Sequence, residues 1–209
     1  MKTILITGAT AGFGEAAARK FVAGGWRAIG TGRRGARLKA LQEELGDAFL
    51  PLQIDMRDFS AVESMAKLSA PWNGIDLLLN NAGLAPPTDP LSKTDWDRIE
   101  TVIDTNITGL VALTRALLPN LVERKGQIIN LSSVAATYPY KGGAVYAGTK
   151  AFVRQFSLDL RSDLAGTGGR VTSVEPGMAE TEFTIVRTGG DKEASDKLCA
   201  DQSIADPDF

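Results

Sequence analysis

The chain has 209 residues and a formal net charge of −2, with 44% hydrophobic residues, one cysteine and no histidine. This length favours one domain, and the low charge without a basic tract argues against nucleic-acid binding. One cysteine excludes an intramolecular disulfide, and the absence of histidine excludes histidine triads, imidazole metal ligands and histidine general bases, so no metal site is expected.

In chain order, short apolar segments rich in β-forming residues alternate with longer segments of helical pattern. The predicted strands are residues 3–7, 26–32, 48–54, 75–79, 127–132 and 170–175. The predicted helices are residues 13–23, 35–45, 59–69, 93–123 and 144–165, with a short one near 191–201. Most strands are almost continuously apolar, which is typical of a parallel sheet covered by helices on both faces. The repeated strand–helix–strand units therefore predict a single α/β domain with a doubly wound, Rossmann-type parallel sheet.

Membrane and export signals are absent from the sequence. The apolar stretch at the N-terminus is too short for a signal peptide, and no apolar run approaches the ~20 residues of a membrane span. A soluble, cytoplasmic protein is therefore expected.

The first strand runs directly into a glycine-rich loop, TILITGATAGFG, at residues 3–14. Gly8 permits a sharp turn after the strand, Gly12 lets backbone N–H groups approach a phosphate, and Gly14 allows close packing of helix and sheet. The helix N-terminus adds positive partial charge for a pyrophosphate. A tight strand–helix turn alone explains such glycines, but their place at the first strand–helix junction of a doubly wound sheet favours dinucleotide binding.

Two arginines, Arg33 and Arg34, follow the second predicted strand, and no acid lies between Trp26 and Gln42. At this position an acid accepts from the ribose 2′-hydroxyl of NAD, whereas a basic group accommodates the 2′-phosphate of NADP. Arginine binds phosphate bidentately. The alternative is a pair of solvated arginines at a helix start, where the helix dipole disfavours cations. The sequence therefore predicts NADP(H) over NAD(H).

Tyr146 and Lys150 lie four residues apart in the predicted helix 144–165, and so share one helix face. An ammonium near a phenol favours the phenolate and lowers the tyrosine pKa from its usual value of about 10. A solvated helix face is the alternative for an isolated pair. If the two side chains point into one cleft, the chain has a general base without histidine.

Four motifs occur together: TGATAGFG at 7–14, NNAG at 80–83, the pair Ser132-Ser133 at a strand end, and Tyr146 with Lys150. This set resembles the short-chain dehydrogenase/reductase family over about residues 1–186. The stretches GATAGFGEAAARKF, GTGRRGARL, VIDTN and YAGTKAFVRQFSLDLRSDL are similar to its branch of NADP-dependent 3-hydroxy acid dehydrogenases. Members of that branch oxidise serine, allo-threonine and related 3-hydroxy acids, or reduce the matching semialdehydes.

The resemblance implies a role for each catalytic candidate. Tyr146 takes the proton from the substrate hydroxyl, Lys150 lowers its pKa and binds the nicotinamide ribose, and Ser133 hydrogen-bonds the substrate oxygen. Asn106 in VIDTNITG is implied to hold a water that links Lys150 to solvent, and an asparagine bonded to its own helix is the alternative. Ser133 and Tyr146 are also the implied substrate contacts.

The resemblance also implies the cofactor contacts. Asp55 and Met56 meet the adenine, Asn81 the adenosine ribose region, and Pro176, Gly177 and Thr181 the nicotinamide carboxamide. Asn80 is expected to be structural. Together with the loop and the arginines, the predicted NADP-binding residues are Gly8, Ala9, Thr10, Ala11, Gly12, Phe13, Gly14, Arg33, Arg34, Asp55, Met56, Asn81, Tyr146, Lys150, Pro176, Gly177 and Thr181.

The C-terminal part departs from the family pattern. Family members continue with a helix and a seventh strand, which this sequence lacks, so the strand at 170–175 is expected to be an open edge. Residues 1–186 are expected to form the NADP-binding catalytic domain, and residues 187–209 a lid remnant and polar tail. Arg187 is a candidate to pair with a substrate carboxylate, and Tyr140 or Tyr138 to shape the pocket. An ordinary exposed arginine and packed aromatic rings are the alternatives.

Assembly and function have alternatives. The family resemblance implies a homodimer or homotetramer through the helices at 93–123 and 144–165, with the dimer favoured. The expected function is NADP-dependent hydride transfer to or from a small substrate such as serine, allo-threonine or 3-hydroxypropionate. The alternatives are a non-catalytic NADP-binding sensor, a reductase of another small carbonyl compound, and a nucleotide-sugar epimerase. Epimerases usually carry a substantial substrate domain that is absent here.

Overall fold

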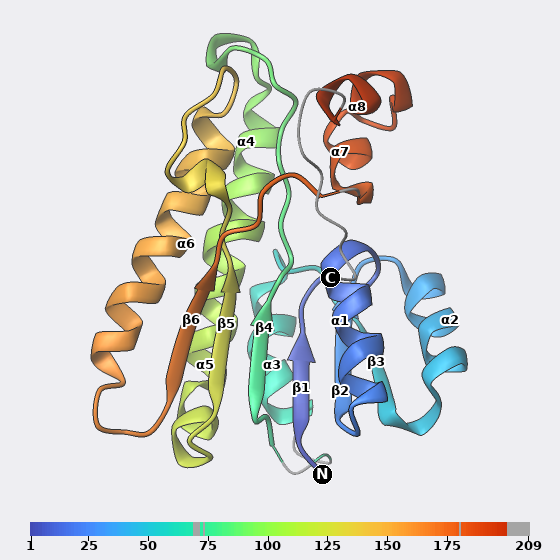
Figure 1. Cartoon of the computed structure of the whole chain (residues 1–209), viewed down its shortest axis with the longest axis vertical. Coiled ribbons are helices and arrows are strands. Elements are labelled where there is room, and N and C mark those ends of the chain that lie inside the picture. The colour runs from blue at the N-terminus through green and yellow to red at the C-terminus, as the bar shows by residue number, and fades with distance from the viewer. Residues whose placement is uncertain (69–71, 73, 180, 200–209) are drawn as a thin grey trace.

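A computed structural model describes residues 1–68, 72, 74–179 and 181–199. Its sheet has six parallel strands in the order β3-β2-β1-β4-β5-β6 (Figure 1). The strands are β1 (Thr3–Ile6), β2 (Arg27–Gly32), β3 (Phe49–Gln53), β4 (Leu77–Asn80), β5 (Gln127–Leu131) and β6 (Arg170–Val174). The predicted doubly wound, Rossmann-type parallel sheet is confirmed. The strand order reverses between β1 and β4, where folds of this kind bind ligands.

Eight α-helices lie in the described part of the chain. They are α1 (Gly12–Ala23), α2 (Gly35–Leu45), α3 (Phe59–Leu68), α4 (Trp96–Ile103), α5 (Gly109–Glu123), α6 (Ala144–Asp163), α7 (Glu182–Arg187) and α8 (Lys192–Cys199). The predicted helix over 93–123 is helical from Trp96 to Glu123, but a π-helical turn at Asp104–Thr108, which was not predicted, lies between α4 and α5. Helix α8 matches the short helix expected near 191–201, whereas α7 was not predicted.

Two apolar cores cover the two faces of the sheet. On one face, Leu78, Ile128 and Val171 of the strands pack with α3, α5 and α6. On the other face, Ile4 and Ile6 pack with α1 and α2. Figure 1 shows α1 and α2 over β1, β2 and β3, but no described helix over β5 and β6 on that side. The second face is therefore only half covered by the described residues.

A buried chain of polar side chains joins β4, β5 and α6. Asn80 donates to Asn130 (2.8 Å) and to Thr114 (3.0 Å), and Asn130 donates to Ser157 (2.9 Å). All four side chains are at most 2% exposed. Buried polar groups need such partners, so the strand-end asparagine Asn80 has the structural place expected for it.

Candidate functional site

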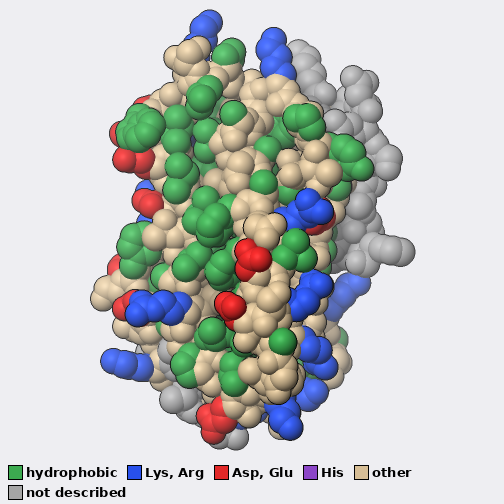
Figure 2. Space-filling model, turned by 90° about the vertical axis from the view of Figure 1, so that its left-hand side faces the viewer, with side chains coloured by type: hydrophobic (Ala, Val, Ile, Leu, Met, Phe, Trp, Pro, Cys, Tyr) green, Lys and Arg blue, Asp and Glu red, His purple; other side chains and the backbone are tan. Residues whose placement is uncertain are grey.

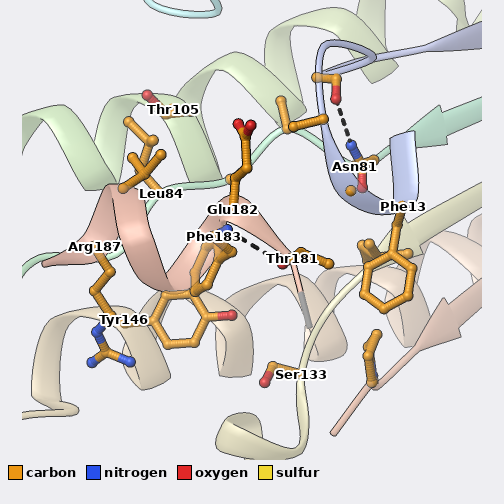
Figure 3. A pocket seen from close by; sticks show the side chains of 18 of the residues that line it. Phe13, Asn81, Leu84, Thr105, Ser133, Tyr146, Thr181, Glu182, Phe183 and Arg187 are labelled. Atoms are coloured by element: carbon orange, nitrogen blue, oxygen red, sulfur yellow. Dashed lines mark hydrogen bonds between the residues drawn. The ribbon is translucent and has the colours of Figure 1, made fainter. Parts of the chain in front are cut away.

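A cavity of about 590 Å³ opens at the carboxyl ends of the strands (Figure 3). Most of the residues predicted to form the site line it: Gly8, Thr10, Ala11, Gly12, Phe13, Arg33, Arg34, Asp55, Met56, Asn81, Ser133, Tyr146, Lys150, Pro176, Gly177 and Thr181. Three predicted residues, Ala9, Gly14 and Asn106, do not line it. Such a volume is ordinary for a cofactor or ligand site.

The glycine loop between β1 and α1 forms one end of the cavity. Gly8 and Gly12 have positive φ angles of 70° and 54°, which other residues rarely adopt. A Cβ on Gly14 would lie 2.4 Å from the carbonyl oxygen of Gly8 and 2.4 Å from the side-chain nitrogen Nδ2 of Asn81. These glycines therefore allow the tight turn and the close helix packing expected of a phosphate-binding loop.

Asn81 supports this loop from the end of β4. Its side-chain amide donates to the carbonyl oxygens of Thr7 (2.8 Å) and Gly8 (3.1 Å), as Figure 3 shows in part. Ala9 is fully buried and packs in the core under the loop. The two residues thus hold the loop's shape, a contribution that the sequence did not indicate.

Three arginines gather beside the loop. Arg34 donates to the backbone and side-chain oxygens of Thr10 and forms an ion pair with Glu182 (2.8 Å). Arg37 pairs with the other carboxylate oxygen of Glu182 (2.7 Å), and the two guanidinium groups lower the pKa of that carboxyl. Arg33 forms no ion pair with a described residue and remains able to bind an anion.

Asp55 follows β3 at the edge of the cavity, with the buried Met56 beside it. The Arg57 guanidinium binds its carboxylate at 2.8 Å and is the largest cause of its lowered pKa. The carboxylate is therefore already paired within the chain, although Asp55 and Met56 both line the cavity.

Tyr146 and Lys150 project from one face of α6 into the other end of the cavity. Tyr146 is 9% exposed and Lys150 5%, so a solvated helix face is wrong. The ammonium of Lys150 donates to the carbonyl oxygen of Leu131 at 2.7 Å and lies 5.7 Å from the Tyr146 ring centroid. Figure 3 shows the Tyr146 hydroxyl pointing into the cavity, on the side where Ser133 lies.

Burial dominates the proton affinities of this pair. It raises the pKa of Tyr146 to about 12, opposed by a hydrogen bond with Ser133 and by the charge of Arg187. Burial lowers the pKa of Lys150 to about 8. In the chain without a bound nucleotide, desolvation therefore outweighs the groups that favour the phenolate. The expectation that Lys150 and an oxidised nicotinamide together lower the pKa of Tyr146 stays a prediction.

The lowered pKa of Lys150 makes stability depend on pH. Between pH 8 and 10.5 the unfolded chain keeps a proton on Lys150 that the folded chain releases, so the free energy of unfolding rises with pH. Denaturant titrations give the free energy of unfolding of the wild type and of Lys150→Met. The wild-type free energy minus that of the variant is expected to rise by up to about 3 kcal/mol between pH 8 and 10.5. A difference that stays flat would contradict the burial of this amine.

Asn106 lies in the π-helical turn, 1% exposed. Its side chain accepts from the backbone N–H of Leu84 (2.8 Å) and donates to the carbonyl oxygen of Leu84 (2.8 Å) and to Thr149 (3.0 Å). Thr149 in turn donates to the backbone of Tyr146. Asn106 is thus bonded to the loop after β4 and to α6, and not to its own helix.

The segment after β6 closes the cavity from the side of α7. Thr181 caps α7 by accepting from the N–H of Phe183 (3.3 Å), a bond drawn in Figure 3. Pro176 accepts from the N–H of Val134 (3.1 Å), which joins this segment to the Ser133 loop. The Phe183 ring lies 5.5 Å from the Tyr146 ring. Thus α7 packs directly on the tyrosine.

Arg187, at the end of α7, reaches the same tyrosine. Its guanidinium donates to the hydroxyl of Tyr140 (2.9 Å) and to the carbonyl oxygen of Pro86 (3.1 Å). The guanidinium carbon lies 5.3 Å from the Tyr140 ring centroid and 5.7 Å from that of Tyr146. Tyr138 also lines the cavity but is 69% exposed.

Several residues with contacts at the site were not predicted, among them Arg37, Thr149, Glu182 and Phe183. Thr149 lies between Tyr146 and Lys150, and Arg37 lies one helical turn after Arg34. These two helical spacings are the features of the sequence that could have indicated Thr149 and Arg37. The sequence contains no comparable signal for Glu182 or Phe183, whose partners are distant along the chain.

The described residues offer neither a metal site nor a membrane span. No group of three or more histidine, cysteine, aspartate or glutamate side chains among them is placed to hold a metal ion. None of their helices combines the length and apolarity that a bilayer crossing requires.

A doubly wound sheet with a glycine loop at the point where the strand order reverses is typical of dinucleotide-binding α/β proteins. The group formed by Ser133, Tyr146 and Lys150 points to one family within this class. The chain belongs to the short chain dehydrogenase family, whose sequence model matches residues 2–190. The family predicted from the sequence is thereby confirmed.

Relatives are similar over most of the chain. Serine 3-dehydrogenase of Agrobacterium fabrum is 60% identical over 197 residues, which are 94% of this chain and 79% of that protein. The NADP-dependent 3-hydroxy acid dehydrogenase YdfG of Escherichia coli K12 is 53% identical over 197 residues, 93% of this chain and 79% of that protein. The closed form of a serine dehydrogenase complexed with NADP⁺ has a TM-score of 0.94 at 50% identity, covering 99% of this chain and 84% of that one.

Proposed function

We propose that the chain is an NADP-dependent dehydrogenase that oxidises the hydroxyl of a small 3-hydroxy acid, such as serine, allo-threonine or 3-hydroxypropionate, or reduces the matching carbonyl. The observation that carries this proposal is the buried Tyr146–Lys150 pair at one end of a cavity whose other end is the glycine loop. The names of relatives at 52–61% identity support the cofactor and the substrate class.

The residues of the cavity fit NADP. The glycine loop lines the cavity at the strand–helix junction where a pyrophosphate binds. Arg33 and Arg34 follow β2, the position of the groups that recognise a 2′-phosphate. Thr181, Pro176 and Gly177 also line the cavity. When bound in its oxidised form, NADP supplies the hydride acceptor and a positive charge that favours the phenolate.

The chain's own groups handle the proton. Tyr146 accepts the proton of the substrate hydroxyl during oxidation and returns it during reduction, while Ser133 hydrogen-bonds the substrate oxygen. Lys150, with a pKa of about 8, carries its charge at neutral pH and stabilises the phenolate. Asn106 positions the loop after β4 against α6, and we assign the water-mediated link between Lys150 and solvent to the same residue.

A substrate panel with NADP tests this proposal. It contains L-serine, D-serine, L-allo-threonine, 3-hydroxypropionate, 3-hydroxyisobutyrate and simple secondary alcohols, and NADPH formation is followed at each. Turnover of at least one 3-hydroxy acid above that of the alcohols is expected. Tight NADPH binding without any turnover would instead favour a non-catalytic sensor, and turnover of alcohols alone would favour a reductase of another carbonyl compound.

We also propose that the chain works in the cytoplasm as a homodimer or homotetramer through the face formed by α4, α5 and α6. Figure 2 shows hydrophobic side chains gathered over the side of the molecule on which α6 lies. Large apolar side chains there are 38–64% exposed: Trp96 and Ile103 on α4, and Phe152 and Leu158 on α6. Apolar patches of this kind mark protein–protein contacts.

Removing apolar contacts on α6 is expected to dissociate this assembly. In the test variant, Asp replaces both Phe152 and Leu158. Phe152 stacks on Phe156 at 5.9 Å. The replacement separates the chains because two desolvated carboxylates disfavour an apolar interface. Light scattering after size exclusion is expected to give the mass of a single chain. Phe59→Asp, a change of a comparably exposed apolar residue on α3, serves as the control. A double variant with unchanged mass excludes this interface.

A further inference from the structure

The substrate end of the cavity is positively charged. The charged residues of the cavity wall are Arg33, Arg34, Asp55, Lys150, Glu182 and Arg187. Both acids are already bound, Asp55 by Arg57 and Glu182 by Arg34 and Arg37. Beside Tyr146, the described residues leave two cations, Lys150 and Arg187, without an ion-pair partner. This end of the cavity is therefore built to accept an anion.

Of these two cations, Lys150 is already engaged. The residue is 5% exposed, and its ammonium donates to the carbonyl oxygen of Leu131. Arg187 is only partly buried, lies on the opposite wall in α7 and faces the Tyr146 ring (Figure 3). Its two donated hydrogen bonds use Nε and Nη2, so Nη1 remains free of any described partner. A guanidinium with free donors at a cavity wall is suited to a carboxylate.

The side chain of Arg187 is held in place by neutral groups. The hydroxyl of Tyr140 and the carbonyl of Pro86 accept from it, and the Tyr140 ring stacks near the guanidinium at 5.3 Å. These contacts orient the cation but leave its charge uncompensated. Because the guanidinium is already held in one orientation, less conformational entropy is lost when an anion binds. Tyr140 is accordingly a positioning residue for Arg187.

We propose that Arg187 binds the carboxylate of the substrate and selects 3-hydroxy acids over neutral alcohols, an inference that rests on the proposed function. In a 3-hydroxy acid one carbon separates the hydroxyl-bearing carbon from the carboxylate. A compact ligand of this kind places its hydroxyl at Tyr146 and its carboxylate at the neighbouring guanidinium.

Two matched probes test this role: 3-hydroxypropionate and its neutral methyl ester. In Arg187→Met the ratio of kcat/KM for the acid to kcat/KM for the ester is expected to fall about 10- to 100-fold, as for loss of a charged hydrogen bond. Arg187→Lys, which keeps the charge, is expected to restore part of the ratio, and Tyr140→Phe to lower it only a few-fold. Arg19→Met removes a guanidinium with exposed ion pairs on α1 and is the control, with an unchanged ratio.

A direct binding measurement separates this inference from the proposed function. Calorimetry with the NADP-bound protein gives the Kd of 3-hydroxypropionate, which is expected to rise 10- to 100-fold in Arg187→Met. An equal loss of kcat/KM for acid and ester, or an unchanged Kd, overturns the role of Arg187 and leaves the dehydrogenase activity standing. If the wild-type protein turns over neither probe, the substrate panel still decides the proposed activity, and the Kd alone decides the inference. Absence of acid binding to the wild type also overturns it.

Discussion

Tyr146→Phe is expected to lower kcat by about 10²- to 10⁴-fold, the contribution typical of a positioned general acid–base group. The substitution removes only the hydroxyl and keeps the buried ring that packs 5.5 Å from Phe183. Binding of NADPH should therefore change little. Steady-state kinetics with a 3-hydroxy acid that the wild type turns over measures kcat. Fluorescence titration with NADPH measures the affinity for the nucleotide.

Tyr138→Phe is the matched control for this result. Tyr138 also lines the cavity, but it is 69% exposed, whereas Tyr146 is 9% exposed. The control is expected to retain kcat within a few-fold, because its hydroxyl has no assigned proton to move. If Tyr146→Phe turns over at a rate comparable to the wild type, the assignment of the base to this residue is wrong.

Replacing Arg33 and Arg34 together by Ala is expected to raise the Kd of NADPH by about 10²-fold or more, while the Kd of NADH changes much less. Each charged hydrogen bond to phosphate typically contributes about 1.5–3 kcal/mol, and NADH lacks the 2′-phosphate that these groups are predicted to bind. Isothermal titration with both nucleotides gives the ratio directly.

Arg37→Ala controls for the loss of contacts with Glu182. Arg34 and Arg37 each bind one carboxylate oxygen of this residue, so Arg37→Ala loosens α7 without removing a predicted phosphate ligand. In Arg37→Ala, the Kd of NADPH and the Kd of NADH are expected to change by about the same factor. Equal increases for both nucleotides in the Arg33/Arg34 double variant would count against recognition of the 2′-phosphate.

Much of the fold was predictable because local patterns determine it. Continuous apolar strands require helices on both faces, and the glycines of the first loop are needed by backbone geometry wherever the loop is found. The π-helical turn at Asp104–Thr108 was not predicted. The turn coincides with a tertiary feature, the bonds from Asn106 to Leu84 and Thr149.

The candidate site divides in the same way. Tyr146 and Lys150 are paired by helix geometry alone, so their shared cavity follows from spacing. The ion pair of Arg34 with Glu182 joins residues 148 positions apart, and no local pattern indicates it. The raised pKa of Tyr146 was also missed, because desolvation depends on Phe183 and other groups that only the folded chain brings near. The catalytic roles themselves stay predictions.

The short helix α7 connects two parts of the cavity wall. Its first residue, Glu182, is tied to the arginines beside the glycine loop, and its last, Arg187, is tied to Tyr140 and Pro86 near Tyr146. Six helical residues span only about 9 Å. The ion pairs at the loop end and the hydrogen bonds at the tyrosine end therefore share one short anchor.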